Sequence, residues 1–267
     1  MTPQTLLQHV DSGELWPAAG EADALDDVAV AYQQALAVRA LRVARGEQPR
    51  GYKIGFTNRS LWQRYAVFAP IWGTVWDTSL SFSDEAGVGV VQLHPSCQPR
   101  IEPETVFGMR ATPAPQAGLD ELFDAIAWVA PGFEIVQSHR PGWKFAAPQA
   151  VADGGLHARL LVGPRRPLAQ VARDATQLHR LLAGATVSLH RDGTAVEAGA
   201  GAAVLDSPLA ALLHFVRELR QCPGAPDLLP GDVVTTGTWT DAWPVQPGQT
   251  WQARFSAPLS ALTVRLR

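Results

Sequence analysis

Cysteine is scarce in this chain of 267 residues, and the motifs of several familiar enzyme classes are missing. Cys97 and Cys222 are the only cysteines and form no C-x-x-C pair, so we expect both to be reduced and structural. The seven histidines are scattered, and no serine stands in a G-x-S-x-G elbow, which leaves a serine-hydrolase interpretation without support. No G-x-G-x-x-G opens a helix after a strand, so nucleotide binding is not expected.

An excess of charge of one sign is also absent. Twenty-two basic side chains against twenty-five acidic ones give a net charge of -3, with no basic stripe, so nucleic acid is not an expected partner. No apolar run approaches the roughly 20 residues that a membrane helix needs. The amino terminus, MTPQTLLQHVDSGELW, lacks the positive and long apolar regions of a signal peptide. We therefore expect a cytoplasmic protein without a membrane partner.

What is present is the composition of an ordinary globular protein, with 46% hydrophobic and 18% charged residues. Helical spacing dominates the first part, where Thr2 and Pro3 open a helix through Val10 and a longer helix runs from Leu25 to Gly46. From Gly73 onward, short strands alternate with glycine and proline. These patterns predict an α+β fold with a small N-terminal α/β region (1–72) and a β-rich catalytic domain (73–267).

The expected elements can be placed approximately. The remaining helices are expected at 120–128, 174–182 and 208–220, the last with Ser207 as N-cap. Strands are expected at 51–56, 74–76, 88–93, 101–109, 132–137, 156–162, 186–190, 194–197, 232–236, 250–255 and 262–266. Asp192 and Gly193 predict a two-residue hairpin turn between two of them.

The most unusual stretch is RIEPETVFGM, residues 100–109, which places two glutamates inside a strand pattern. Residues two apart on a strand point to the same face, so Glu102 and Glu104 lie side by side. Two neighbouring like charges cost free energy unless a cation or a shared proton compensates, which makes the pair a candidate site for a hard metal ion. The alternative is a solvated strand face.

Glu134 is a third candidate, because it too interrupts an apolar, strand-like segment (PGFEIVQS). Buried carboxylates are rare unless they are paired or bind a metal. Three glutamates would form an all-oxygen half-shell suited to Mg²⁺ or Mn²⁺, whereas zinc would favour histidine or thiolate, and neither clusters nearby in sequence. The alternative for Glu134 is a salt bridge to Arg100, Arg140 or Lys144.

Lys53 is the one charge in the glycine-bounded strand GYKIGF. Burial there would lower its pKa toward the range useful for proton transfer, and the alternative is a side chain that extends from an edge strand into solvent. Asp77 and Ser138 are further catalytic candidates: Asp77 follows the aromatic run IWGTVW, and Ser138 follows Glu134 closely enough to share its face. A turn is the alternative for Asp77, and a turn also explains Asp153.

Together these segments resemble the 2-keto-4-pentenoate hydratase and 4-oxalocrotonate decarboxylase family of the fumarylacetoacetate-hydrolase superfamily. The resemblance covers nearly the whole chain and rests on the order and spacing of several motifs: AYQQ (31–34), GYKIG (51–55), E-x-E (102–104), EIV (134–136), VAD (151–153), VLDSPLAAL (204–212) and PGDVVTTGT (230–238). It implies a mixed sandwich or roll core, a divalent metal held by Glu102, Glu104 and Glu134, and Lys53 in the active site.

The activity that the resemblance implies is hydration of a 2-hydroxy-2,4-dienoate to a 4-hydroxy-2-oxo acid in aromatic catabolism. The nearest alternative is decarboxylation of a 4-oxalocrotonate-like diacid, for which Arg59, Arg64, Arg140 and Lys144 are candidate anchors of the distal carboxylate. C–C bond hydrolysis would need a histidine and carboxylate pair, and none is visible in the matching segments. A non-catalytic partner subunit is the alternative of another class.

Several residues depart from the family pattern. Pro103 replaces a small residue between the two glutamates and removes a ladder donor, which predicts a strand edge or a bulge. VADGG replaces A-D-N-A-S, Asp206 stands where glycine is usual, and Phe56 with the additional tryptophans predicts a differently shaped pocket. The resemblance also implies a homo-oligomer and a possible complex with a related enzyme of the family.

Overall fold

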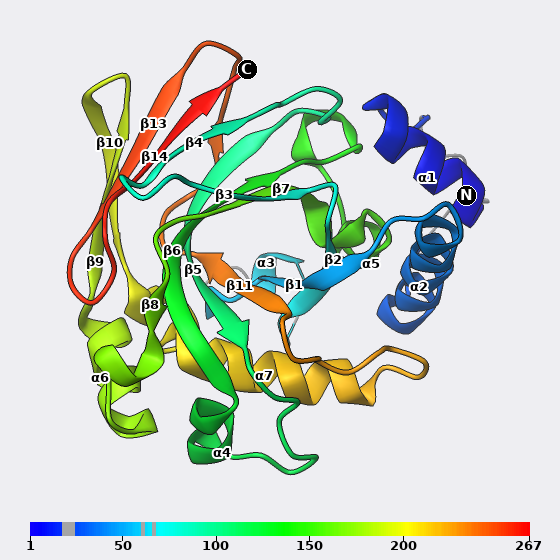
Figure 1. Ribbon diagram of the computed structural model, residues 1–267. Helices are drawn as coiled ribbons and strands as arrows, with labels where there is room; N and C mark the ends of the chain where they lie inside the picture. Colours follow the sequence, from blue (N-terminus) through cyan, green and yellow to red (C-terminus); the bar gives the residue numbers. More distant parts are fainter. Residues whose placement is uncertain (18–24, 60–61, 66–67) are drawn as a thin grey trace.

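The computed structural model describes residues 1–17, 25–59, 62–65 and 68–267. In these ranges the chain forms two β-sheets flanked by α-helices, with α1 and α2 together at one edge (Figure 1). This arrangement confirms the predicted α+β class and the helical N-terminal region.

The larger sheet contains the strands that bear Lys53 and the three candidate glutamates. Its order is β2-β1-β11-β5-β6-β7-β3. Its strands are β1 (Pro49–Gly55), β2 (Ile71–Trp76), β3 (Leu80–Phe82), β5 (Arg100–Met109), β6 (Ile126–Val136), β7 (His157–Val162) and β11 (Val233–Thr238), with β12 (Trp243–Pro244) on β5 and β8 (Arg166–Pro167) on β6. The smaller sheet consists, in spatial order, of β10 (Thr194–Ala200), β9 (Thr186–Arg191), β13 (Thr250–Phe255), β14 (Leu262–Leu266) and β4 (Val88–Val91).

Helices cover the outside of the larger sheet, and α7 runs along it against β11, β1 and β2 (Figure 1). The helices are α1 (Pro3–Ser12), α2 (Val28–Ala44), α3 (Trp62–Tyr65), α4 (Leu119–Asp124), α5 (Ala147–Ala152), α6 (Ala175–Gly184) and α7 (Pro208–Gln221). The predicted caps are confirmed for α1 and α7: Thr2 accepts from the Thr5 amide at 3.2 Å and Ser207 from the Ala210 amide at 3.1 Å.

The boundary between the helix expected at 120–128 and the strand expected at 132–137 was wrong, and one helix was not predicted. The helix expected at 120–128 ends at Asp124, and Ile126 already belongs to β6. Strand β6 is almost entirely apolar and mostly buried on both faces, so it lacks the alternation that distinguishes a strand from a buried helix. Helix α5 was missed because its six residues are too few to show a helical period.

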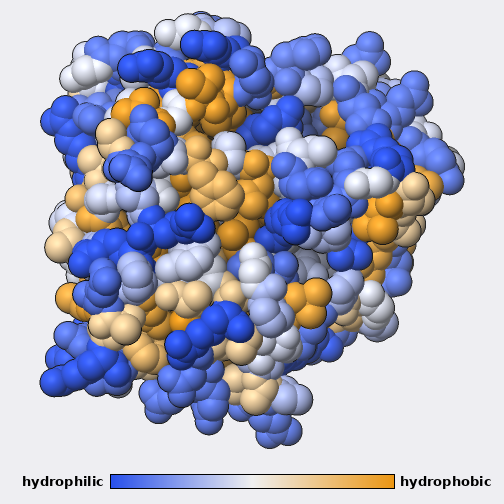
Figure 2. Space-filling view, viewed as in Figure 1, coloured by the Kyte–Doolittle hydropathy of each residue, from blue (hydrophilic) through white to orange (hydrophobic). Residues whose placement is uncertain are grey.

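The predicted division at residue 72 remains a prediction about domains. The structure adds that β1 and β2, on either side of that boundary, pair with each other and lie in the same sheet as β5 and β6. Among the described residues, no helix is both long and apolar enough to cross a membrane. On the face shown in Figure 2, apolar side chains reach the surface in separate patches among polar ones.

The larger sheet curves so strongly that β2, at one end of the strand order, also contacts β7. Inside this curve lies a small apolar cluster that is separate from the main core. Its members come from five strands: Val75, Val106, Ala130, Leu160, Val162 and Val233. Val106 follows Glu104 by two residues and therefore shares its face. The candidate glutamates therefore lie next to an apolar layer, which excludes water from that side of the site.

Candidate metal centre and its cavity

Strand pairing brings the three candidate glutamates together. In the antiparallel β5–β6 ladder, Glu102 lies directly opposite Glu134, and Glu104 lies opposite Gly132. Each glutamate offers one carboxylate oxygen, and these oxygens all lie within 4.8 Å of one another. Within the described ranges, no other group of three His, Cys, Asp or Glu side chains has ligand atoms this close.

A bulge in β11 holds Glu104. The β11–β5 register shifts between Thr235 and Thr238, which turns the Gly237 amide toward Glu104 Oε2 at 2.7 Å, and the Thr235 hydroxyl donates to the same oxygen. Gly237 has φ +103, and a Cβ there would meet the Thr57 hydroxyl at 2.0 Å, so only glycine fits. Oε1 of Glu104 is buried and has no partner among the described residues.

Pro103 lies in the central strand β5, so the expected strand edge is absent. The alternative expectation, a bulge, is met in the neighbouring strand β11. The Pro103 carbonyl accepts from the Trp239 amide at 3.0 Å, just after β11 ends, and β12 pairs with β5 only from Ile101. Backbone N and C=O of one strand residue point to the same side. The proline nitrogen therefore faces the gap between β11 and β12, where no ladder donor is required.

Glu134 is held by two side chains from other strands. Lys53 Nζ lies 3.1 Å from its Oε2, and His157 Nδ1 lies 2.9 Å from its Oε1. Both carboxylate and ammonium are buried, at 0% and 3% exposure. The salt bridge to Arg100, Arg140 or Lys144 that was the alternative for Glu134 is therefore made by Lys53 instead.

One lysine among three carboxylates leaves an excess of buried negative charge. Burial is the largest cause that raises the pKa of Glu102 to about 7; the Lys53 ammonium opposes the shift, and the Glu134 carboxylate adds to it. Burial and both neighbouring glutamates raise the pKa of Glu104 well above its ordinary value. Burial opposes the Lys53 ammonium, yet the carboxylates outweigh it, Glu134 foremost, and raise the pKa of Lys53. The expectation that burial would lower that pKa is therefore wrong, and the site favours an additional cation.

Of the three glutamates, Glu102 lines a cavity of ≈ 590 Å³. Lys53 and Glu102 lie in its wall, with aromatic side chains on several sides, among them Trp143 and Trp239. Two further cations line it: exposed Lys144, and half-buried Arg100, whose guanidinium stacks 4.3 Å from the centre of the Trp143 ring. The cavity therefore combines charged, polar and aromatic side chains in one wall.

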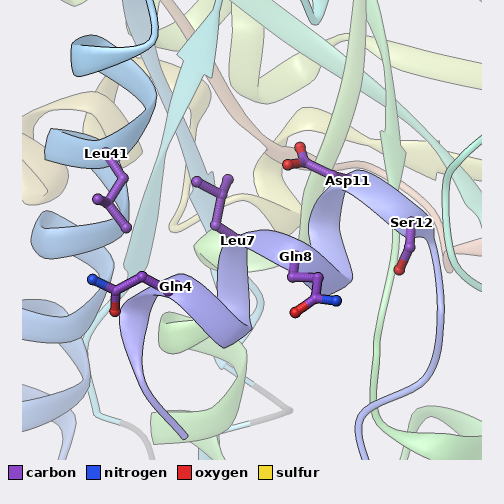
Figure 3. Close-up of a pocket in the computed structure, with 6 residues that line it drawn as sticks. All are labelled: Gln4, Leu7, Gln8, Asp11, Ser12 and Leu41. Atoms are coloured by element: carbon purple, nitrogen blue, oxygen red, sulfur yellow. The ribbon is translucent and has the colours of Figure 1, made fainter.

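A second hollow, of ≈ 490 Å³, lies between α1 and α2 (Figure 3). Its lining residues are Gln4, Leu7, Gln8, Asp11, Ser12 and Leu41. The one carboxylate there, Asp11, pairs with Arg45 at 2.6 Å. No group in this groove has the burial or the converging charges of the glutamate site, so it is not a candidate catalytic cavity.

The other candidate catalytic residues lie outside the cavity wall. Asp77 is exposed in a turn, where its Oδ1 accepts from the amides of Gln48 at 3.0 Å and Thr78 at 2.9 Å. Ser138 is buried, and its hydroxyl accepts from the Arg140 amide at 3.2 Å. Both side chains thus have local structural partners, and the structure does not bring them to the glutamates.

Two histidine and carboxylate pairs were not visible in the sequence. His157 contacts Glu134, as described above, and buried His139 Nδ1 lies 2.5 Å from Asp153 Oδ1. Asp153 also accepts from the His139 amide at 2.9 Å, so its role extends beyond the expected turn. The expectation that the matching segments contain no histidine and carboxylate pair is therefore wrong. The partners stand 14 and 23 positions apart, and no short motif reports that spacing.

Of the predicted anchors for a distal carboxylate, Lys144 lines the cavity, whereas Arg59 pairs with Asp206 at 2.8 Å and Arg140 is not part of the wall. The Arg64 side chain lies outside the described part of the chain. Arg100, which was not among those candidates, takes a place in the wall because it shares the face of β5 with Glu102.

Comparison with known proteins places this arrangement in a family. The chain is 31% identical to a 4-oxalocrotonate decarboxylase from Pseudomonas sp. over 245 residues, which cover 92% of this chain and 89% of the relative. The chain belongs to the 2-keto-4-pentenoate hydratase and 4-oxalocrotonate decarboxylase family. It is also 29% identical to a 2-keto-4-pentenoate hydratase from Paraburkholderia xenovorans, over 97% of this chain and 92% of the hydratase. A comparison with models of protein families gives no match.

Solved structures agree with membership of the hydratase and decarboxylase family. A 4-oxalocrotonate decarboxylase from Pseudomonas putida G7, complexed with magnesium and adipate, superimposes with a TM-score of 0.87 at 25% identity, over 99% of this chain and 95% of that one. A fumarylpyruvate hydrolase from Pseudomonas aeruginosa, in complex with Mn²⁺ and pyruvate, superimposes with a TM-score of 0.57 at 17% identity, over 81% and 88%. This second likeness concerns the fold alone.

Proposed function

We propose that this protein is a divalent-metal-dependent lyase that hydrates a 2-hydroxy-2,4-dienoate to a 4-hydroxy-2-oxo acid in aromatic catabolism, with Mg²⁺ or Mn²⁺ held by Glu102, Glu104 and Glu134. The observation that carries the proposal is the group of three carboxylates, two buried and one half-buried, with oxygens within 4.8 Å, inside a family that contains hydratases and decarboxylases. The magnesium bound to the decarboxylase from P. putida G7 supports the choice of cation.

The residues present fit such an ion. Oε1 of Glu104 is buried without a partner among the described residues, and the three carboxylates carry more negative charge than Lys53 balances. All the ligands are oxygens, which suits a hard cation. When bound, the ion would stabilise negative charge on the 2-oxygen of the substrate.

We propose that Lys53 moves a proton at the substrate or donates a hydrogen bond to its oxygen. Its Nζ is fixed 3.1 Å from Glu134 Oε2, and its side chain lines the same cavity as Glu102. Ketonisation places a proton on C5, and water addition then places a hydroxyl on C4 and a proton on C3. The carboxylates raise the pKa of Lys53, and a bound cation would offset their charge and make the oriented ammonium a better donor.

Decarboxylation of a 4-oxalocrotonate-like diacid is the second candidate, and one observation favours it. Arg100 and Lys144 line the cavity beyond the glutamates, where they can receive a distal carboxylate. Trp143 orients the Arg100 guanidinium by stacking at 4.3 Å.

Supplying the protein with Mg²⁺ and a panel of 2-hydroxydienoates, with and without a distal carboxylate, separates the two reactions. Loss of dienol absorbance without CO₂ indicates the hydratase, and loss with CO₂ release indicates the decarboxylase. Absence of turnover together with absence of metal binding would favour the third alternative, a non-catalytic partner subunit in a complex with a related enzyme. Sedimentation of the purified chain tests the expected homo-oligomer.

Replacement of Arg100 by methionine gives a specific expectation for the distal carboxylate. Methionine preserves packing on Trp143 but removes the guanidinium, so kcat/KM for a diacid substrate should fall about 10- to 100-fold, the magnitude of one lost charge-assisted contact. The value for a monoacid dienoate should stay within about threefold. Equal losses for both substrates would show that Arg100 does not read the distal group.

Metal affinity should depend on pH because the empty site binds protons. The Glu102 pKa is raised to about 7, by burial first, and that of Glu104 is also raised. Below this pH the Glu102 carboxyl is protonated and the ion must displace its proton, so affinity should fall about tenfold per unit as pH decreases below about 7. Calorimetric titration with Mg²⁺ in buffers of different ionisation enthalpy measures the released protons; affinity independent of pH would contradict the expectation.

A further inference from the structure

No sequence motif indicated His157. An irregularity in the β6–β7 ladder directs its side chain toward the site. The β6–β7 register shifts between Ile135 and Val136, so that Val136 pairs with His157 and Ile135 with Arg159. Such a bulge changes the direction of a side chain relative to the regular alternation of the strand. The imidazole consequently reaches Glu134 Oε1 at 2.9 Å and has 4% side-chain exposure.

Each nitrogen of the His157 imidazole has one hydrogen-bond partner. Glu134 is a carboxylate and accepts, so Nδ1 of His157 carries a proton. Nε2 lies 2.8 Å from the Ser79 hydroxyl, which itself accepts from the Trp76 amide at 3.0 Å. The Ser79 hydroxyl has two acceptors within hydrogen-bond distance, Nε2 of His157 at 2.8 Å and the Trp76 carbonyl at 3.1 Å. Nε2 is the closer acceptor, which gives the order Trp76 N–H to Ser79, Ser79 O–H to Nε2, and Nδ1–H to Glu134.

We infer that His157, held in one tautomer by Ser79, is a positioning residue that orients Glu134 for metal binding. It occupies Oε1 and leaves Oε2, which lies 3.1 Å from Lys53 Nζ and accepts no other hydrogen bond among the described residues. A neutral N–H donor satisfies one carboxylate oxygen without adding a second positive charge that would compete with the cation. The inference rests on the proposed function, since it takes Glu134 to be a metal ligand.

The sharpest test compares asparagine and glutamine at position 157. The amide nitrogen of asparagine can occupy the place of Nδ1 and donate to Glu134, whereas that of glutamine occupies the place of Nε2 and faces Ser79. We expect His157→Asn to keep Mn²⁺ affinity within about threefold, and His157→Gln to weaken it about 10- to 100-fold, as loss of an outer hydrogen bond to a metal ligand does. Electron paramagnetic resonance of free Mn²⁺ measures both dissociation constants without an activity assay.

Ser79→Ala supplies an independent arm. Without the serine proton, the imidazole can move its own proton to Nε2 and turn a lone pair toward the carboxylate, so Mn²⁺ binding should weaken by about three- to tenfold in the wild-type background. In the His157→Asn background, which has no Nε2, the same change should have no further effect. Thermal melting of the metal-free variants checks that each one folds.

The outcomes separate this inference from the proposed function. Wild-type protein that binds no Mn²⁺ would refute the proposed metal site itself. Wild-type binding with equal affinities for the asparagine and glutamine variants would overturn the positioning role and leave the metal site standing. An equal effect of Ser79→Ala in both backgrounds would also overturn it, because the serine would then act by another route.

Discussion

Glu104→Gln should reduce turnover about 100- to 1,000-fold or more and should abolish Mg²⁺ binding in the accessible concentration range. The glutamine oxygen can keep the bonds that Glu104 Oε2 accepts from the Thr235 hydroxyl and the Gly237 amide. The other atom becomes an NH₂ group at the position of the unpartnered Oε1, and an amide nitrogen with two protons cannot ligate a cation. The variant therefore removes a ligand atom while preserving local packing.

The measurement pairs steady-state turnover of a 2-hydroxydienoate with Mn²⁺ binding. Glu85→Gln is a matched control, because this glutamate is exposed in a turn between β3 and β4 and the same chemical change there should alter neither quantity. Retention of both metal affinity and turnover by Glu104→Gln would refute the proposed function. Loss of turnover with unchanged metal affinity would remove Glu104 from the ligand set alone.

Lys53→Met should separate metal binding from catalysis. Methionine is of similar length and apolar, so it can occupy a site that is 3% exposed. Loss of the ammonium removes a positive charge beside the carboxylates, so Mn²⁺ affinity should be equal to or higher than that of the wild type. Turnover should nevertheless fall about 100- to 10,000-fold, the usual contribution of a positioned proton donor.

Parallel measurement of kcat and of the Mn²⁺ dissociation constant checks this separation. A variant that binds the ion and retains turnover within about tenfold would show that Lys53 balances charge but takes no part in proton transfer. A variant that loses the ion would show that the ammonium organises the ligands. Either result contradicts the role given to Lys53.

The sequence predicted the location of the site but not its immediate surroundings. Glu102 and Glu104 share a face because strand alternation is a local rule, and Glu134 stands out as a charge in an apolar strand. The register that sets Glu134 opposite Glu102 depends on the pairing of β5 with β6, which local patterns do not determine. The bulges that aim His157 and the Gly237 amide are irregularities of the ladders and leave no periodic signal.

Two departures from the family pattern have structural explanations. Asp206, where glycine is usual, has φ +74, a conformation that suits glycine, and its carboxylate receives both bonds from Arg59, at 2.8 and 2.9 Å. Gly154 and Gly155, which replace larger residues, have φ +65 and +68, and Gly155 lines the cavity. From the sequence alone, Asp206 and the two glycines could only be recognised as differences from the family pattern.

The predicted anchors show the same limit. Four basic residues were proposed for a distal carboxylate on the basis of charge and proximity in sequence, and only Lys144 is seen in the cavity wall. Arg100 was considered only as a partner of Glu134. Its position follows from strand alternation, since it precedes Glu102 by two residues, and its stacking on Trp143 depends on a loop that no local pattern places.

The central claim is that Glu102, Glu104 and Glu134 together bind a catalytic divalent cation. A crystal structure of the protein with Mn²⁺ and an unreactive 2-oxo acid tests it most directly, because anomalous scattering locates manganese independently of any assumed chemistry. We predict one anomalous peak within about 2.0 to 2.3 Å of an oxygen from each of the three glutamates. A structure with no peak there, or with manganese bound elsewhere in the cavity, would contradict the claim.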